Sequence, residues 1–174
     1  MSYPPLKGLH WIEGPWAGRL AVSARPRGSD WLQDEVKGWR AFGVDTVISL
    51  LTPVEADDLG LSEEATRCNE EGADFVSFPI VDRSIPRSRE EAEKLLRSLE
   101  AALTAGKTVV IHCRQGLGRS ALMAAGLLVL GGIKIEEAFR RLSASRGSLV
   151  PETEEQRKWV EEFARDLAVT PVAS

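Results

Sequence analysis

The sequence predicts an α/β fold, a single domain whose mostly parallel central sheet is flanked by helices on both faces. Two observations predict it. Short runs rich in Val, Ile and Leu alternate along the chain with longer segments in which apolar residues recur at helical intervals. The 174 residues are 43% hydrophobic, which suffices for one sizeable core but is short for two. We therefore expect one domain over residues 1–174, with its core at about 20–163.

This alternation of apolar runs and periodic segments predicts each strand and helix in order along the chain. The strands are the short apolar runs RLAVSA (19–24), TVISLL (46–51), DFVSFPI (74–80) and KTVVIH (107–112). The helices are the longer periodic segments between and after them, at 30–42, 62–71, 87–105, 118–130, 135–145 and 152–167. Ligands of such sheets bind beyond the carboxyl ends of the strands, so functional residues are expected there.

Composition excludes several classes of partner. The net charge is −4 and the pI about 5.4, and acidic and basic residues are interleaved, so a nucleic-acid partner is not expected. No stretch approaches the roughly 18 apolar residues of a membrane span, and residues 1–8 lack the apolar run of a signal peptide. The two cysteines form no secreted disulfide framework. We therefore expect a monomer in the cytoplasm.

One segment dominates the functional interpretation: residues 112–120 read HCRQGLGRS. It lies between the strand-like run 108–111 and the apolar helical segment 121–130, so this loop ends at a helix N-terminus. Unpaired backbone N–H groups and the helix dipole make such a terminus an anion site. Gly116 and Gly118 let the backbone curl so that successive amides point at one small anion.

The residue types in this loop predict attack on a bound phosphate ester. Cys113 lies at the base of the cradle, where the dipole and the amides favour its thiolate. Arg119 adds a planar fork that can grip two phosphoryl oxygens. The competing interpretation is a small core cysteine and a solvated arginine at a helix start. The residues expected to bind the phosphate are Arg114, Gln115, Gly116, Leu117, Gly118 and Arg119.

This spacing resembles the signature of the cysteine-dependent protein tyrosine phosphatase superfamily, His-Cys, five residues, Arg, then Ser or Thr. Within it the chain is most similar to small dual-specificity phosphatases of the kinase-associated type. The similarity also involves FPIVDRSIP at 78–86 and SARPRGS at 23–29, and it covers about residues 20–163. It implies the dual-specificity phosphatase fold. The signature positions are His112, Cys113, Arg119 and Ser120.

Phosphoryl transfer from oxygen to a thiolate needs an acid that protonates the leaving oxygen. Asp82 is the predicted acid because it follows the strand-like run 75–80, at that strand's carboxyl end, in a Pro-containing loop. The loop resembles the general-acid loop of dual-specificity phosphatases, which implies that Asp82 also activates water afterwards. The alternative is an aspartate that caps a turn. Weaker candidates are Asp57 and Asp58, in an expected loop, and Asp74, at the wrong end of its strand.

Three residues are expected to support this chemistry. The resemblance implies that the Ser120 hydroxyl steadies the thiolate as it leaves a phosphocysteine, while capping of the following helix is the alternative. His112 is expected to hydrogen-bond loop backbone and so fix the loop's shape. Gln156, which follows Arg146-Gly147-Ser148, resembles a glutamine that related phosphatases place near the hydrolytic water. An exposed helical glutamine is the ordinary alternative.

Two further motifs have structural interpretations. Cys68 lies among glutamates that should raise its pKa, so we expect a plain helical cysteine rather than a redox partner of the nucleophile. Residues 101–108, AALTAGKT, satisfy a loose nucleotide-binding pattern, but a helix precedes them and a strand follows, the reverse of a phosphate loop. Gly106 instead ends the helix. No metal-ligand spacing occurs, so no metal or other cofactor is expected.

Together these features predict hydrolysis of phosphate monoesters on protein phosphotyrosine through a phosphocysteine intermediate, with phosphoserine and phosphothreonine left open. The alternatives are a phosphoinositide or inositol-phosphate phosphatase and a phosphopeptide-binding module. Phosphoinositide sites need several cations at the rim, whereas this loop offers Arg114 alone. A phosphorylated protein or peptide is therefore the expected partner. We expect Arg83, Arg87 and Arg89 to bind acidic or phosphorylated residues beside the target phosphoamino acid.

Overall fold

Five strands form one sheet in the order β1-β2-β5-β3-β4 in the computed structural model, which describes residues 8–169. All neighbours pair in parallel except β1, which runs antiparallel to β2. The prediction of a mostly parallel central sheet is therefore confirmed. The strands are β1 (Leu9–Ile12), β2 (Arg19–Ser23), β3 (Thr46–Ser49), β4 (Asp74–Ser77) and β5 (Thr108–His112).

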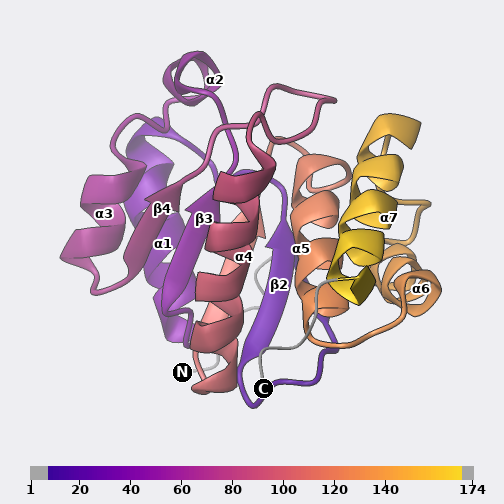
Figure 1. Ribbon diagram of the computed structural model, residues 1–174. Helices are drawn as coiled ribbons and strands as arrows, with labels where there is room; N and C mark the ends of the chain where they lie inside the picture. Colours follow the sequence, from indigo (N-terminus) through magenta and orange to yellow (C-terminus); the bar gives the residue numbers. More distant parts are fainter. Residues whose placement is uncertain (1–7, 170–174) are drawn as a thin grey trace.

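Helices cover both faces of the sheet, as predicted. One face carries α1 and α3, and the other carries α4, α5 and α7 (Figure 1). The six predicted helices are present with small shifts at their ends. The helices are α1 (Leu32–Ala41, after the short turn Ser29–Trp31), α2 (Pro53–Asp58), α3 (Glu64–Glu70), α4 (Arg89–Thr104), α5 (Arg119–Leu130), α6 (Ile135–Arg146) and α7 (Glu154–Val169).

The structure contains two elements that the sequence analysis did not predict, β1 and α2. β1 has only four residues, of which Ile12 alone is buried, so its apolar signal is weak. α2 occupies the segment expected to be a loop, and Asp57 and Asp58 therefore belong to a helix. A capping box between Thr52 and Glu55 starts that helix, because each side chain pairs with the other's backbone N–H.

The strand predicted at 74–80 leaves the regular ladder after Ser77. The residues after Ser77 remain hydrogen-bonded to the segment that follows β3, because the backbone N–H of Ile80 donates to the carbonyl of Leu50 at 3.0 Å. At the other end of the sheet, α4 stops at Thr104 and Gly106 has a φ of +90° before β5 begins. Residues 101–108 therefore form a helix end, as predicted, and not a phosphate loop.

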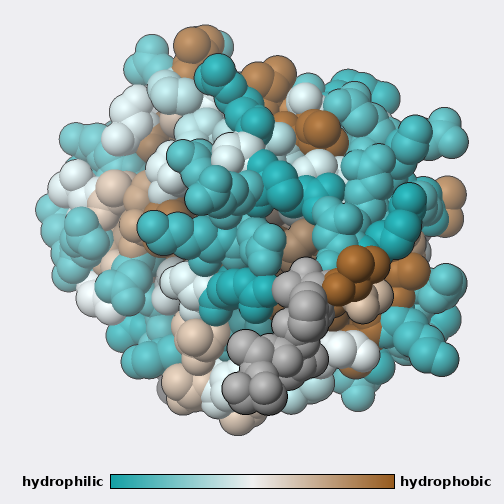
Figure 2. Space-filling view, in the orientation of Figure 1, coloured by the Kyte–Doolittle hydropathy of each residue, from teal (hydrophilic) through white to brown (hydrophobic). Residues whose placement is uncertain are grey.

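The core consists of two apolar clusters separated by the sheet. Along β5, Val109 and Ile111 pack beneath α4 and α5, whereas Val110 belongs to the cluster under α1 and α3. α5 is buried almost throughout, as its Ala and Leu content predicts. α4 is amphipathic, and Figure 2 shows the outer surface on this side of the molecule as mainly hydrophilic. β5 is thus fixed from both faces, which makes it a rigid base for the residues that follow it.

The carboxyl ends of the parallel strands meet at one edge of the sheet, where Ser23, Ser49 and His112 lie in register. The N-termini of α4, α5 and α7 lie at the same end of the molecule (Figure 1). Within residues 8–169 no helix has the length and apolar character to cross a membrane. Residues 1–7, on which the signal-peptide expectation rests, lie outside the described part of the chain.

Candidate active site

The predicted phosphate loop joins the end of β5 to the start of α5. Gly116 has a φ of +73°, and a Cβ on it would lie 2.8 Å from the backbone of Ser23, so both dihedral and space require glycine. The Gly116 N–H donates to Cys113 Sγ at 3.2 Å, so this amide points into the cradle as predicted. Gly118 has a φ of −109° and a ψ of −81°, outside the left-handed region. A Cβ at this position would lie 2.9 Å from Gln156 Oε1, so the Gln156 side chain would have to shift to admit one.

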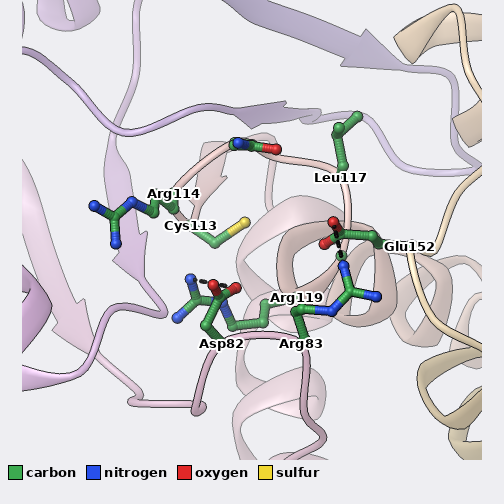
Figure 3. Close-up of a pocket in the computed structure, with 9 residues that line it drawn as sticks. Asp82, Arg83, Cys113, Arg114, Leu117, Arg119 and Glu152 are labelled. Carbon is green, nitrogen blue, oxygen red and sulfur yellow. Dashed lines mark hydrogen bonds and ion pairs between the residues drawn. The ribbon is translucent and has the colours of Figure 1, made fainter.

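Cys113 lines a cavity of about 70 Å³ that opens at this edge of the sheet. Its sulfur points into the cavity (Figure 3), although the residue is only 3% exposed. The walls come from three segments: the phosphate loop, the loop after β4 and the turn before α7. The lining residues are Asp82, Arg83, Cys113, Arg114, Gln115, Leu117, Gly118, Arg119 and Glu152.

Arg119 is buried at the back of this cavity, which contradicts the alternative of a solvated arginine. Its Nη1 and Nη2 donate to the two carboxylate oxygens of Glu55 at 2.7 and 3.0 Å, and Nη1 also donates to the Ile80 carbonyl at 2.8 Å. Burial works to lower the pKa of Arg119, but the bond to Glu55 and the charges of Cys113, Glu55 and Asp82 raise it above its ordinary value. The guanidinium is therefore held charged and fixed in direction.

Glu55 is a site residue that the sequence analysis missed. Burial tends to raise the pKa of its carboxyl, but hydrogen bonds from Arg119 and Thr52 and the charge of Arg119 outweigh burial, so the pKa is lowered. The only local signal is the Thr-Pro-Val-Glu capping box at 52–55. That pattern predicts a helix start and says nothing about an arginine 64 residues further along the chain.

Asp82 lies beside Arg119, with its Oδ1 3.2 Å from Nη2 (Figure 3). The side chain is 54% exposed, so a substrate can reach it. Asp82 lies within a turn in which the Ser84 N–H donates to the Val81 carbonyl and Arg83 has a φ of +62°. Asp82 therefore lies where a leaving-group oxygen could receive a proton. None of the weaker candidates lines the cavity; these are Asp57, Asp58 and Asp74.

Ser120 is completely buried in the first turn of α5. The residue that caps this helix is Gly118, so the alternative of a helix-capping serine is wrong. Within the described residues the Ser120 hydroxyl has no hydrogen-bond partner. A buried polar group of this kind is uncommon, and it leaves the hydroxyl available to a group that changes charge during a reaction.

His112 does not hydrogen-bond the loop backbone as expected. Its Nε2 donates to Glu64 Oε1 at 2.6 Å, and both side chains are buried. Glu64 is the first residue of α3, on the far face of the sheet from α5. Sequence analysis missed it because nothing in a glutamate-rich helix marks one carboxylate as buried.

Both cysteines are free thiols. Burial, with a smaller contribution from Glu64, raises the pKa of Cys68 to about 12. The predicted direction of this change is correct, but desolvation rather than the surrounding carboxylates is its main cause.

Gln156 is fully buried, so the alternative of an exposed helical glutamine is wrong. Its Nε2 donates to the Ser84 carbonyl at 3.0 Å, and its Oε1 accepts from the Thr153 N–H at 3.2 Å. The side chain thus contacts the loop that carries Asp82.

The basic residues are less available to a substrate than the sequence suggests. Arg83 Nη1 donates to Glu152 Oε1 at 2.8 Å across the cavity wall. The Arg114 side chain extends away from the sulfur (Figure 3). Arg89 donates to Asp166 and lies over the Trp159 ring, so it belongs to the α4–α7 contact. Arg87 is exposed and outside the cavity lining.

Comparison with known proteins identifies this arrangement. Residues 21–133 match the family described as "Polymorphic toxin system, DSP-PTPase phosphatase". The chain belongs to this phosphatase family. The match includes the loop of Asp82 and the whole phosphate loop, so the resemblance inferred from these two loops is confirmed.

Individual relatives agree with this assignment. The chain is 35% identical over 86 residues to "Putative tyrosine phosphatase 197R" of Invertebrate iridescent virus 6, covering 47% of this chain and 31% of that protein. It is 27% identical over 139 residues to "Cyclin-dependent kinase inhibitor 3" of Sus scrofa, covering 79% of this chain and 65% of that protein. The chain therefore spans 31% of the length of the viral relative and 65% of the length of the porcine one.

Solved structures confirm the fold. Kinase associated phosphatase (KAP), with its catalytic-site cysteine replaced by serine, superposes with a TM-score of 0.84 at 23% identity, covering 94% of this chain and 97% of that one. Tk-PTP in its active form gives a TM-score of 0.76 at 28% identity, covering 92% and 98%.

Proposed function

We propose that this chain hydrolyses phosphate monoesters on phosphorylated proteins through a phosphocysteine intermediate. One observation carries the proposal: the Cys113 sulfur lies at the base of a cavity whose walls present the Arg119 guanidinium and the Asp82 carboxyl from different segments. A nucleophile, an oxyanion-binding cation and a proton donor thus surround a space sized for one phosphoryl group.

The chemistry follows from these positions. The Cys113 thiolate attacks phosphorus, an S–P bond forms as the ester P–O bond breaks, and Asp82 gives its proton to the departing oxygen. Water then attacks the phosphocysteine while the Asp82 carboxylate takes a proton from it. The S–P bond breaks, the thiolate is restored, and inorganic phosphate leaves. Arg119 and the loop amides hold the phosphoryl oxygens in both steps.

The rim of the cavity favours a phosphorylated protein over a polyphosphorylated inositol. Gln115 and Leu117 are uncharged, Arg114 extends away, and Glu152 pairs with Arg83 at the rim. Additional phosphates would therefore meet a carboxylate and few free cations. Phosphotyrosine is the proposed target, with phosphoserine and phosphothreonine as further ones. We also propose a cytoplasmic location, where reducing conditions keep the Cys113 thiol free.

Replacement of the nucleophile tests the proposed chemistry. Cys113→Ser should lose turnover by several orders of magnitude but still bind a phosphopeptide, because the amides and Arg119 remain. Cys68→Ala is the matched control, since Cys68 is the other buried thiol and lies outside the cavity. Substantial activity of Cys113→Ser, or loss of wild-type activity on adding EDTA, would contradict the mechanism.

A substrate panel tests the target class. Peptides carrying phosphotyrosine, phosphoserine or phosphothreonine are compared with soluble phosphoinositides as kcat/KM, at low and high salt. We expect the peptides to be preferred. A preference for phosphoinositides would overturn the proposed substrate while leaving the Cys113 chemistry intact.

A further inference from the structure

The loop that carries Asp82 is attached at two points to the segment around the start of α7. Gln156 Nε2 donates to the Ser84 carbonyl at 3.0 Å, and Arg83 Nη1 donates to Glu152 Oε1 at 2.8 Å (Figure 3 shows the second contact). These contacts are made by the two residues that follow Asp82 in its turn. The second is an ion pair with side-chain exposures of 61% and 33%, so solvent screens it and it holds the loop weakly. The buried bond from Gln156 is the stronger constraint.

The Gln156 amide is itself fixed in orientation. Its Oε1 accepts from the Thr153 N–H at 3.2 Å, and its own backbone N–H donates to Thr153 Oγ1 at 3.1 Å. This reciprocal pair is the capping-box arrangement, in which a Thr and a Gln three residues later satisfy each other at a helix start. Because the oxygen side of the amide is used in the cap, the NH₂ side faces Ser84. The helix start therefore dictates which group the acid loop meets.

The loop needs such an external constraint. Asp82 is half exposed, so its position depends on the backbone on either side of it. On the N-terminal side Ile80 is pinned, since its N–H donates to Leu50 and its carbonyl accepts from Arg119. On the C-terminal side Arg83 has a φ of +62°, an unfavourable conformation for a residue with a Cβ, which persists only where neighbours enforce it. The Ser84 N–H bond to the Val81 carbonyl closes the turn, and the bond from Gln156 to the Ser84 carbonyl holds it from outside the loop.

The same side chain also touches the phosphate loop. A Cβ on Gly118 would lie 2.9 Å from Gln156 Oε1 and 3.0 Å from Nε2, so the amide packs directly against the last loop residue before Arg119. Gln156 therefore spans the distance between the end of the phosphate loop and the backbone just beyond Asp82. A shift of this one amide would change the separation between the proton donor and the bound phosphoryl group.

We propose that Gln156 is a positioning residue that holds Asp82 over the phosphate loop. The inference rests on the proposed phosphatase function. It differs from the role that the resemblance implies, in which the glutamine lies near the hydrolytic water, because both ends of this amide are engaged by Thr153 and Ser84. The two roles act on different steps, since a proton donor serves the departure of the leaving group and a water-directing group serves the breakdown of phosphocysteine.

Gln156→Leu tests this with a series of aryl phosphates that differ in leaving-group pKa. If Asp82 is misplaced, kcat/KM should fall tenfold or more for the poorest leaving groups and little for the best, which steepens the dependence on leaving-group pKa. The same substitution in Asp82→Asn should add no further steepening, because the donor is already gone. Glu155→Gln, at an exposed position of α7, is the matched control and should leave the dependence unchanged.

A second variant separates positioning from loss of the helix cap. Gln156→Glu keeps an oxygen for the Thr153 N–H but replaces the donor to Ser84 with an acceptor. It should therefore steepen the dependence of kcat/KM on leaving-group pKa while α7 stays folded. An unchanged dependence in both variants, or a uniform fall in kcat with a product burst, would overturn the inference and favour the water-directing role. Activity that survives in Cys113→Ser would instead overturn the proposed function itself.

Discussion

His112 Nε2 donates a 2.6 Å hydrogen bond to Glu64 Oε1, and the two side chains are 0% and 2% exposed. This bond ties the residue before the nucleophile to the start of α3, a helix on the opposite face of the sheet from α5. The end of β5 is thus fixed from behind while the phosphate loop leaves it in front. Within the described residues the other ring nitrogen of His112, Nδ1, has no partner, so the orientation of the ring depends on Glu64.

Glu64→Ala should therefore be strongly destabilising for a single substitution. It leaves the buried imidazole without its only hydrogen-bond partner among the described residues, which costs about 1–3 kcal/mol of unfolding free energy. We expect kcat/KM to fall as well, since Cys113 follows directly. Glu63→Ala is the control: that neighbour is 69% exposed and pairs with Arg67 in solvent, a contact worth at most about 1 kcal/mol. Equal unfolding free energies for the two variants, measured in urea, would refute the structural importance of the buried bond.

Asp82→Asn tests the assignment of the acid. An asparagine cannot donate the proton, so the rate should fall by about 10²–10⁴ for phenyl or alkyl phosphates and less for leaving groups that depart unprotonated. The measurement is kcat/KM across a leaving-group series. Asp74→Asn, at the other end of β4 and outside the cavity, should behave as wild type. Parallel dependences for wild type and Asp82→Asn would assign the acid to another residue.

Ser120→Ala should slow the second step without destabilising the fold. The hydroxyl caps no helix and has no partner within residues 8–169, so its removal breaks no hydrogen bond in the free protein. If it steadies the departing Cys113 thiolate, phosphocysteine should accumulate and rapid kinetics should show a burst of product. A lowered Tm with an unchanged steady-state rate would contradict this role.

The Glu55–Arg119 pair predicts a stability change in acid. The pKa of Glu55 in the folded protein lies below the ordinary value of 4.5, so the folded state binds fewer protons near that pH than the unfolded state. The stability from this pair is fully present above pH 4.5 and is lost as the pH falls through the lower, folded pKa. Glu55→Gln should therefore have a lower Tm than wild type at neutral pH, and the gap should narrow below pH 4.5. A gap that is constant with pH would show that the ionised carboxylate is not responsible.

Local patterns predicted much of the fold and of the site. Hydrophobic periodicity reflects which side of an element faces the core, so it was sufficient to assign the six helices and three of the strands. Those strands were predicted at 19–24, 46–51 and 107–112. β1 and α2 were not predicted because each is short, and a short segment has too few residues for its period to be recognised. The continuation of β4 was overestimated because the apolar run persists after the ladder ends.

The sequence by itself determined the phosphate loop, because Cys113, Gly116 and Arg119 act through adjacent backbone amides and one helix terminus, all within nine residues. Only the tertiary structure decided what holds these groups in place. Arg119 meets Glu55, His112 meets Glu64, and Gln156 meets Ser84 across chain separations of 64, 48 and 72 residues. No local propensity encodes such pairs. They form because parallel strands bring distant loops to one edge of the sheet, where a polar side chain that loses water must find its partner in another segment.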